Sequence, residues 1–242
     1  MITAVTFDLW DTLMTDRDLV GRQALRATRL RETLAPFGVY PDDEELARAF
    51  ARSWDNFDRI WNGEHRTPTT AESTDVVLGS LGVTVPAATR TAVTRLLEDL
   101  VLEVPPVPVE GAVEVVVELA AGYRLGLVSD TGLSPGRALR EVLERLGLLR
   151  HFDFLYFSDE GGMSKPDPRV FSLVLEKLGA RPCEAVHVGD IARTDIEGAR
   201  RAGMRAIHFV GMNASDAEGS TADLVINRLV DLPAALEKLS GA

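Results

Sequence analysis

From residue 110 onward the chain alternates short apolar runs with helical patterns, and this alternation restricts its fold more than any other feature. The apolar runs resemble buried strands, because they contain β-branched residues and are bounded by glycine or polar residues. Strands that alternate with helices form βαβ units with right-handed crossovers, so the strands become parallel neighbours. We therefore predict an α/β fold, a Rossmann-like parallel sheet in a three-layer core. The predicted strands cover residues 2–7, 123–128, 152–157, 185–188, 205–210 and 224–226, and the predicted helices cover 110–121, 135–146, 168–178, 195–202 and 232–239.

Residues 15–104 interrupt the alternation and show helical periodicity alone. Apolar residues recur there every three or four positions, and proline and glycine separate one pattern from the next. The proline-rich segment 105–108 ends this insert, and we expect a hinge there. The predicted domains are an α/β core of residues 1–14 and 105–242 and an all-helical insert of residues 15–104. The helical patterns of the insert cover approximately residues 20–34, 46–61, 69–81 and 86–103.

The charge balance excludes two classes of partner. The chain has 26 basic and 37 acidic residues, a formal net charge of −11. Nucleic acids and anionic membranes bind basic surfaces, so neither is expected as a partner. A small anionic substrate is compatible with this charge where a metal ion reverses the local field. The sequence does not indicate the oligomeric state.

The cysteine content and the N-terminus lead us to expect a cytoplasmic protein. Cys183 is the single cysteine, so no internal disulfide can form. Asp8 and Asp11 interrupt the apolar N-terminal stretch, which therefore does not resemble a signal peptide. No apolar run approaches the roughly 20 residues of a membrane span.

Three predicted strands end at polar residues, namely Asp8, Ser129 and Asp190. Parallel strands place their carboxyl ends at one edge of the sheet, where open α/β sheets bind ligands. Lys165 lies between the second and third of these strands, in a loop that two prolines hold extended. Two carboxylates, a hydroxyl and an ammonium predict a site for an anionic group together with a cation.

Each of these residues also has a structural alternative. Asp8 can cap the turn that follows its strand, and Ser129 with Asp130 can begin a turn. Lys165 can be a solvated loop residue. Asp195 can be an acid in the first turn of a helix, where it interacts with the helix dipole.

In order and spacing, these segments resemble the four motifs of the haloacid dehalogenase superfamily. The insert that follows the first motif resembles the small helical cap of that family, and the whole α/β part of the chain matches its core. The matching residues are Asp8 and Thr12 in the first motif, Ser129 in the second, Lys165 before proline and a helix in the third, and Gly189-Asp190 with Asp195 in the fourth.

The resemblance implies a metal-dependent hydrolase whose substrates are small phosphorylated metabolites. By position, Asp8 would be the nucleophile and would form an aspartyl intermediate. Ser129 would donate a hydrogen bond to the transferring group. Lys165 would neutralise charge on Asp8 and on the phosphoryl oxygens.

The resemblance also implies the metal ligands. Mg²⁺ would bind Asp8, the backbone carbonyl of Trp10 and Asp190. Asp195 would be either a direct ligand or a residue that holds the other groups in place. The remaining candidate substrate-binding residues are Thr12, Asp130 and Arg22. Arg22 shares a helix face with Arg26 and Arg29, and of these three it is the nearest in sequence to the first motif.

Trp10 departs from the family pattern. Phosphatases of the family have a second aspartate at this position, which serves as general acid and base, whereas the dehalogenases have a tyrosine and need no metal. Trp10 therefore favours a dehalogenase, while Asp190 after Gly189 favours a metal and phosphoryl transfer. We give the acids more weight, because the metal would use only the backbone carbonyl of Trp10. The alternatives are a 2-haloacid dehalogenase-type carbon–halogen hydrolase and a weakened member that mainly binds a ligand or a protein.

Three further features are expected to be structural. The apolar stripe that includes Trp54, Phe57 and Trp61 predicts the core of the insert. His187 lies within an apolar strand, which also predicts a core position. The polar stretch 211–221 predicts a loop.

Overall fold

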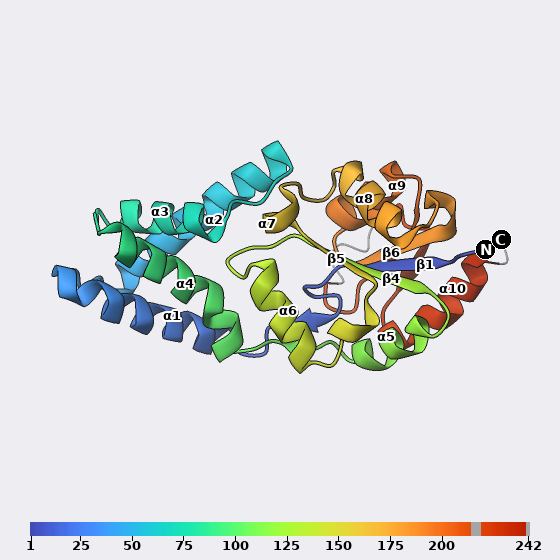
Figure 1. The fold of residues 1–242 in the computed structure, drawn as a ribbon, viewed down its shortest axis with the longest axis horizontal. Helices are drawn as coiled ribbons and strands as arrows, with labels where there is room; N and C mark the ends of the chain where they lie inside the picture. The colour runs from blue at the N-terminus through green and yellow to red at the C-terminus, as the bar shows by residue number, and fades with distance from the viewer. Residues whose placement is uncertain (214–218, 241–242) are drawn as a thin grey trace. The chain divides into compact units, whose positions relative to one another are not determined.

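The computed structural model describes residues 1–213 and 219–240. These residues form two compact units (Figure 1). The α/β unit contains Met1–Thr15, Val107–Asp130 and the chain from Leu143 onward, and the helical unit contains Asp16–Pro106 and Thr131–Val142.

The α/β unit has a six-stranded parallel sheet, which confirms the predicted fold class. The strand order is β5-β4-β1-β6-β7-β8, so the chain builds outward from β1 first on one side and then on the other. A ligand crevice is expected where the direction of building reverses, at the carboxyl ends of the central strands. The strands are β1 (Ala4–Phe7), β4 (Arg124–Ser129), β5 (Phe154–Phe157), β6 (Ala185–Gly189), β7 (Arg205–Phe209) and β8 (Leu224–Ile226).

Helices cover both faces of this sheet. Figure 1 shows α8 and α9 on one face and α5 and α10 on the other. All residues of β1 and β6 are buried, as expected for strands packed on both sides. The helices outside the insert are α5 (Ala112–Ala120), α6 (Gly136–Arg145), α7 (Ser158–Gly161), α8 (Pro168–Leu178), α9 (Glu197–Arg201) and α10 (Leu232–Ser240), and the short helical turns are η2 (Leu149–His151), η3 (Pro182–Glu184) and η6 (Leu229–Asp231).

The helix predicted at 195–202 begins differently. The chain first makes a π-helical turn, η4 (Ala192–Ile196), and continues as α9. Single π-turns occur frequently at functional sites. Asp195 therefore lies in an irregular turn and not in the first turn of a regular helix.

A small ladder joins the two points where the chain leaves and re-enters the α/β unit. β2 (Met14–Thr15) pairs antiparallel with β3 (Val107–Pro108). The backbone N–H of Val109 also donates to the carbonyl of Leu13, at 3.0 Å. Half of the proline-rich segment 105–108 is therefore a paired strand.

The helices of the insert begin at side-chain caps and enclose their own core. Asp42 and Thr69 each form a capping box with the glutamate three residues later. The core residues of the helical unit are Leu30, Leu34, Leu46, Ala49, Phe50, Val77, Leu78, Val93, Leu97 and Leu100. The helices are α1 (Leu19–Leu34), α2 (Asp43–Glu64), α3 (Thr70–Ser80) and α4 (Ala87–Glu103), with the short turn η1 (Ala35–Phe37) after α1.

The segment Thr131–Val142, which includes most of α6, groups with the helices of the insert. The Thr70 hydroxyl donates to the carbonyl of Leu133 at 3.1 Å. Arg137 forms ion pairs with Glu98 and, at 2.7 Å, with Asp99. These polar contacts connect the segment to α3 and α4.

The described residues of the predicted loop 211–221 are irregular. Residues 211–213 and 219–221 lie outside helices and strands, and residues 214–218 lie outside the described part of the chain. Within the two described ranges, we find no helix with the length and apolar composition that a membrane crossing requires.

Candidate active site

Asp8 and Asp190 lie next to each other because the strands that they follow are neighbours. β1 pairs with β6, and each aspartate comes directly after its strand. The backbone N–H of Asp8 donates to the carbonyl of Val188 at 2.9 Å, which continues the ladder by one residue. Asp195 completes a buried cluster in which ligand oxygens of the three carboxylates lie within 4.8 Å of one another.

Lys165 is the cation of this cluster. Its ammonium donates to Asp8 Oδ1 and, at 2.7 Å, to Asp195 Oδ1. The side chain is 3% exposed, so the alternative of a solvated loop lysine is wrong. Burial alone would lower the pKa of Lys165, but the carboxylates of Asp195 and Asp8 outweigh it and hold this pKa well above its usual value. Lys165 is therefore a fixed positive charge beside Asp8.

Both carboxylate oxygens of Asp195 are occupied. Oδ1 accepts from Lys165 and lies 3.2 Å from Nε2 of His187, and Oδ2 accepts from the backbone N–H of Ile191 at 3.0 Å. Burial would raise the pKa of Asp195, but Lys165 and His187 hold it well below its usual value. Asp195 is thus an ionised, firmly held carboxylate with little capacity left for a further cation.

Gly189 leaves room for the carboxylate of Asp195. A Cβ at this position would lie 2.3 Å from Asp195 Cγ, a distance that real Cβ atoms do not reach. Any other residue at 189 would displace Asp195, because Lys165, His187 and Ile191 hold its carboxylate in place. The glycine before Asp190 is therefore required by close approach.

The three carboxylates of the cluster share the ammonium of Lys165, so ionising both Asp8 and Asp190 would leave an excess of negative charge. Burial raises the pKa of Asp8 to about 7 even though Lys165 acts in the opposite direction. Burial and the charges of Asp8 and Asp195 raise the pKa of Asp190 to about 8. A divalent cation between Asp8 and Asp190 would offset this repulsion, and carboxylate oxygens are the ligands that Mg²⁺ and Ca²⁺ prefer. The cluster fits a divalent metal.

The other predicted residues of the α/β unit lie around this cluster. Ser129 Oγ is buried and has no hydrogen-bond partner among the described residues, as expected of a hydroxyl that bonds a ligand. The Thr12 hydroxyl donates to Asp190 Oδ1 at 3.4 Å. Asp130 Oδ1 accepts from the backbone N–H of Lys165 at 3.1 Å. Thr12 and Asp130 thus contact the acid and the lysine of the site.

Trp10 and Asp11 form a tight turn after Asp8. The N–H groups of Leu13 and Met14 both donate to the carbonyl of Leu9, and Asp11 adopts the left-handed conformation with φ of 53°. The carboxylate of Asp11 is exposed and accepts from the Thr15 hydroxyl at 2.6 Å. The hydrogen-bond partner of Asp11 is therefore Thr15, on the same turn. The indole of Trp10 is half-buried.

Arg22 belongs to the helical unit. Its guanidinium pairs with Asp16 Oδ1 at 2.6 Å and donates from Nη2 to the carbonyl of Val104 at 2.7 Å. Arg22 thus connects the beginning of the insert with its end. Its role in substrate binding stays a prediction.

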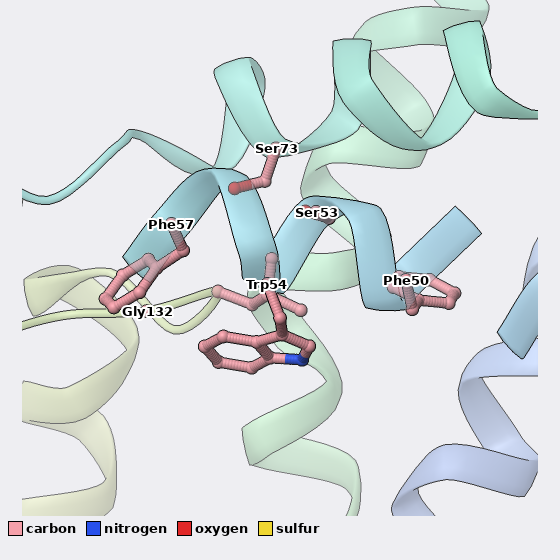
Figure 2. A pocket seen from close by; sticks show the side chains of 7 residues that line it. Phe50, Ser53, Trp54, Phe57, Ser73 and Gly132 are labelled. Carbon is pink, nitrogen blue, oxygen red and sulfur yellow. The ribbon is translucent and has the colours of Figure 1, made fainter. Parts of the chain in front are cut away.

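The aromatic stripe of α2 is only partly core, which corrects the prediction. Phe50 is buried, whereas Trp54 is 45% exposed and Phe57 and Trp61 are partly exposed. The ring of Trp54 lies 3.5 Å from where a Cβ of Gly132 would stand. Figure 2 shows the side chains that line a pocket beside Trp54. The pocket is lined by Phe50, Ser53, Trp54, Phe57, Ser73, Gly132 and Leu133.

Sequence reasoning missed the polar role of His187. The residue is fully buried, as predicted, but its ring nitrogens face Thr6 at 2.8 Å and Asp195 at 3.2 Å. Thr6 and His187 are directly paired across β1 and β6. A polar residue in each of two apolar strands was the available signal, but which strands are neighbours could not be read from the sequence.

Comparison with known proteins adds independent information. The sequence profile described as haloacid dehalogenase-like hydrolase matches residues 2–203. The chain is 31% identical over 222 residues to the haloacid dehalogenase-like hydrolase domain-containing protein 3 of Mus musculus, covering 88% of this chain and 83% of that protein. It is 30% identical over 225 residues to a glyceraldehyde 3-phosphate phosphatase of Methanothermobacter thermautotrophicus, covering 90% and 89%. A solved 2-haloacid dehalogenase from Pseudomonas syringae aligns with a TM-score of 0.73 at 26% identity, covering 98% and 99%.

Proposed function

Because the chain belongs to the haloacid dehalogenase-like hydrolase family, we propose that it is a Mg²⁺-dependent phosphatase of small phosphorylated metabolites. The observation that carries this proposal is the buried cluster of Asp8, Asp190 and Asp195 around the ammonium of Lys165, because a divalent cation would offset the excess negative charge of three carboxylates. The similarity to a protein named as a phosphatase supports it. The dehalogenases of the family work without a metal, so they do not need this negative charge to bind one.

In this proposal Asp8 is the nucleophile. One carboxylate oxygen forms a bond to phosphorus, the bond from phosphorus to the ester oxygen breaks, and the leaving group departs with the electron pair. Lys165 and the Ser129 hydroxyl hold the phosphoryl oxygens. Water then attacks the phosphorus of the aspartyl phosphate, which frees phosphate and restores Asp8.

The metal would be held by Asp8, Asp190 and the backbone carbonyl of Trp10, with water or substrate oxygens as further ligands. When bound, Mg²⁺ supplies positive charge to the phosphoryl oxygens. Asp195 positions Lys165, which agrees with the occupied oxygens of its carboxylate. Thr12 positions Asp190, Asp130 positions the Lys165 backbone, and Arg22 is the candidate substrate contact from the insert.

We also propose that the helical insert, residues 15–104, serves as a cap that excludes water and selects the substrate. The insert encloses a hydrophobic core of its own residues, which supports a role as a separate cap domain. A single cysteine fits a reducing compartment, and we propose a cytoplasmic location.

A screen for product release tests the proposed activity. The protein is incubated with a panel of phosphorylated metabolites and with 2-haloacids, each with and without Mg²⁺. We expect phosphate release that requires Mg²⁺ and no halide release. Halide release without metal would instead establish the dehalogenase alternative, which Trp10 favours. Tight ligand binding without turnover would indicate a weakened member of the family.

Lys165 is expected to act through its charge. Lys165→Ala should lower kcat by about 10²- to 10³-fold, the usual loss for one electrostatic contact to a transition state. Lys165→Arg should keep part of the activity, because it keeps the charge but not the geometry. Steady-state rates, with thermal unfolding to verify the fold, measure both effects. Capture of a substrate adduct on Lys165 by borohydride would contradict this role and indicate Schiff-base chemistry.

Trp10 is expected to make hydrolysis depend on the leaving group. An indole cannot donate a proton to the departing oxygen, so acyl and aryl phosphates should react much faster than alkyl phosphates. Trp10→Asp should restore about 10²- to 10⁴-fold, mostly on alkyl phosphates. Rates for a series of phosphate esters in both proteins measure this dependence. A flat series combined with an inactive Asp11→Asn variant would show that Asp11 supplies the proton.

A further inference from the structure

A continuous set of buried polar groups runs from β1 to the site. The Thr6 hydroxyl lies 2.8 Å from His187 Nδ1, and His187 Nε2 lies 3.2 Å from Asp195 Oδ1. The same oxygen accepts from Lys165, which also donates to Asp8. All five side chains are buried. The ring of Phe171 packs edge-on against His187, with ring centroids 5.0 Å apart.

The carboxylate of Asp195 fixes the direction of the hydrogen bonds in this set. An ionised carboxylate has no proton to donate, so the proton between His187 and Asp195 is on Nε2. In a neutral ring Nδ1 is then an acceptor, and it takes the hydroxyl proton of Thr6. The other acceptor near that hydroxyl, the carbonyl of Val186, is more distant at 3.4 Å. Thr6 thus holds the ring in the orientation that aims Nε2 at Asp195.

We propose that Thr6 and His187 are positioning residues that set how the Lys165 ammonium is shared between Asp195 and Asp8. This inference deepens the proposed function and rests on it. Lys165 has two carboxylate partners, one that holds it and one that reacts. Without the hydrogen bond from His187, Asp195 Oδ1 keeps Lys165 and Oδ2 keeps the backbone N–H of Ile191, so the carboxylate is held less firmly than before. The ammonium then shifts toward Asp8, where it makes the nucleophile less reactive.

Kinetics of matched variants separate positioning from a structural role. His187→Leu removes both ring hydrogen bonds, His187→Gln keeps an amide donor near the position of Nε2, and Thr6→Val removes only the hydroxyl. We expect His187→Leu to lower kcat by about 10- to 100-fold with little change in KM, as for other residues that orient an active-site ligand. His187→Gln should recover most of the loss, and Thr6→Val should show a smaller decrease.

A control variant shows what losing a buried hydroxyl does elsewhere. Thr74 is fully buried in the helical unit and donates to the carbonyl of Thr70 at 2.8 Å. Thr74→Val should lower stability to an extent similar to Thr6→Val and leave kcat unchanged. Inhibition constants add a second comparison, in which His187→Leu weakens binding of orthovanadate, a transition-state mimic, more than binding of inorganic phosphate.

Nitrogen NMR of the imidazoles tests the geometry without relying on activity. The His187 signals are identified by their absence in His187→Gln, and we expect a neutral ring protonated at Nε2. In Thr6→Val the Nδ1 signal should move while Nε2 keeps its proton. A proton on Nδ1 alone would overturn the proposal, as would a folded His187→Leu variant with unchanged kcat.

The two experiments also separate this proposal from the proposed function. If the wild type releases halide and no phosphate, the phosphatase proposal fails, and the same variants are compared on the 2-haloacid. If the wild type has no activity, the phosphatase proposal fails, and the NMR result alone decides whether the hydrogen bonds from Thr6 to Asp195 exist as described.

Discussion

Replacing Asp8 with asparagine is expected to reduce turnover by about 10⁴- to 10⁶-fold, the range seen when a nucleophile is removed from an enzyme that forms a covalent intermediate. An amide has the shape of the carboxylate but lacks its nucleophilicity. The fold should survive, because Lys165 keeps Asp195 as its partner and one of the mutually repelling carboxylates is removed. Phosphate release from the best substrate of the wild type measures the loss.

A second aspartate on the same turn provides the matched control for Asp8. Asp11 is exposed and bonded to Thr15, so Asp11→Asn should change turnover by only a few-fold. Thermal unfolding of both variants verifies that they are folded. A folded Asp8→Asn variant with more than a tenth of the wild-type rate would show that Asp8 is not the nucleophile.

Metal removal should have the other large effect. We expect an excess of chelator to lower the rate by at least about 10³-fold and added Mg²⁺ to restore it, since the metal would supply several kcal/mol of charge stabilisation.

Asp190→Asn should raise the Mg²⁺ concentration needed for half-maximal activity by at least tenfold, in line with about 10- to 100-fold for weaker perturbations around a metal. A titration of the rate against free Mg²⁺ measures both.

Asp195 provides the contrast to Asp190. Its carboxylate is already bonded to Lys165, His187 and Ile191, so Asp195→Asn should lower kcat without a comparable change in the Mg²⁺ requirement. Equal shifts in the Mg²⁺ requirement for the two variants would make Asp195 a direct ligand. Full activity of the wild type in excess chelator would contradict phosphoryl transfer assisted by a metal.

The residues that meet at the sheet edge could be predicted because parallel strands fix where their carboxyl ends lie. Asp8 and Asp190 each follow an apolar run, and the order of strands places these two side by side. Ser129 and Lys165 could be included because the chain carries them between the same strands. The presence of the site therefore follows from the apolar runs that end at polar residues and from the rule that parallel strands place their carboxyl ends at one edge of the sheet.

The supporting contacts could not be predicted, because they depend on register and on tertiary packing. The pairing of Thr6 with His187 requires the alignment of two strands that are 181 residues apart. The ladder of β2 and β3 has two residues in each strand, too few to show alternation. The segment Thr131–Val142 groups with the insert, and the ion pairs and the hydrogen bond that connect it to α3 and α4 join residues far apart in sequence.

The stripe on α2 illustrates the same limit within one helix. Helical spacing shows which residues share a face, and Phe50 on that face is buried as expected. The spacing does not show how far the neighbouring helix extends over the face. Trp54, on the same face, lies next to Gly132 and is 45% exposed.

The most direct test of the central claim is to identify the group bound to Asp8 during turnover. The wild type is mixed with its best phosphate ester and Mg²⁺, quenched in acid within one turnover, digested and analysed by mass spectrometry. We predict a phosphoryl group on the carboxylate of Asp8, absent from Asp8→Asn. Phosphate release with an unmodified Asp8 throughout, or an alkyl ester formed on Asp8 from a 2-haloacid, would contradict it.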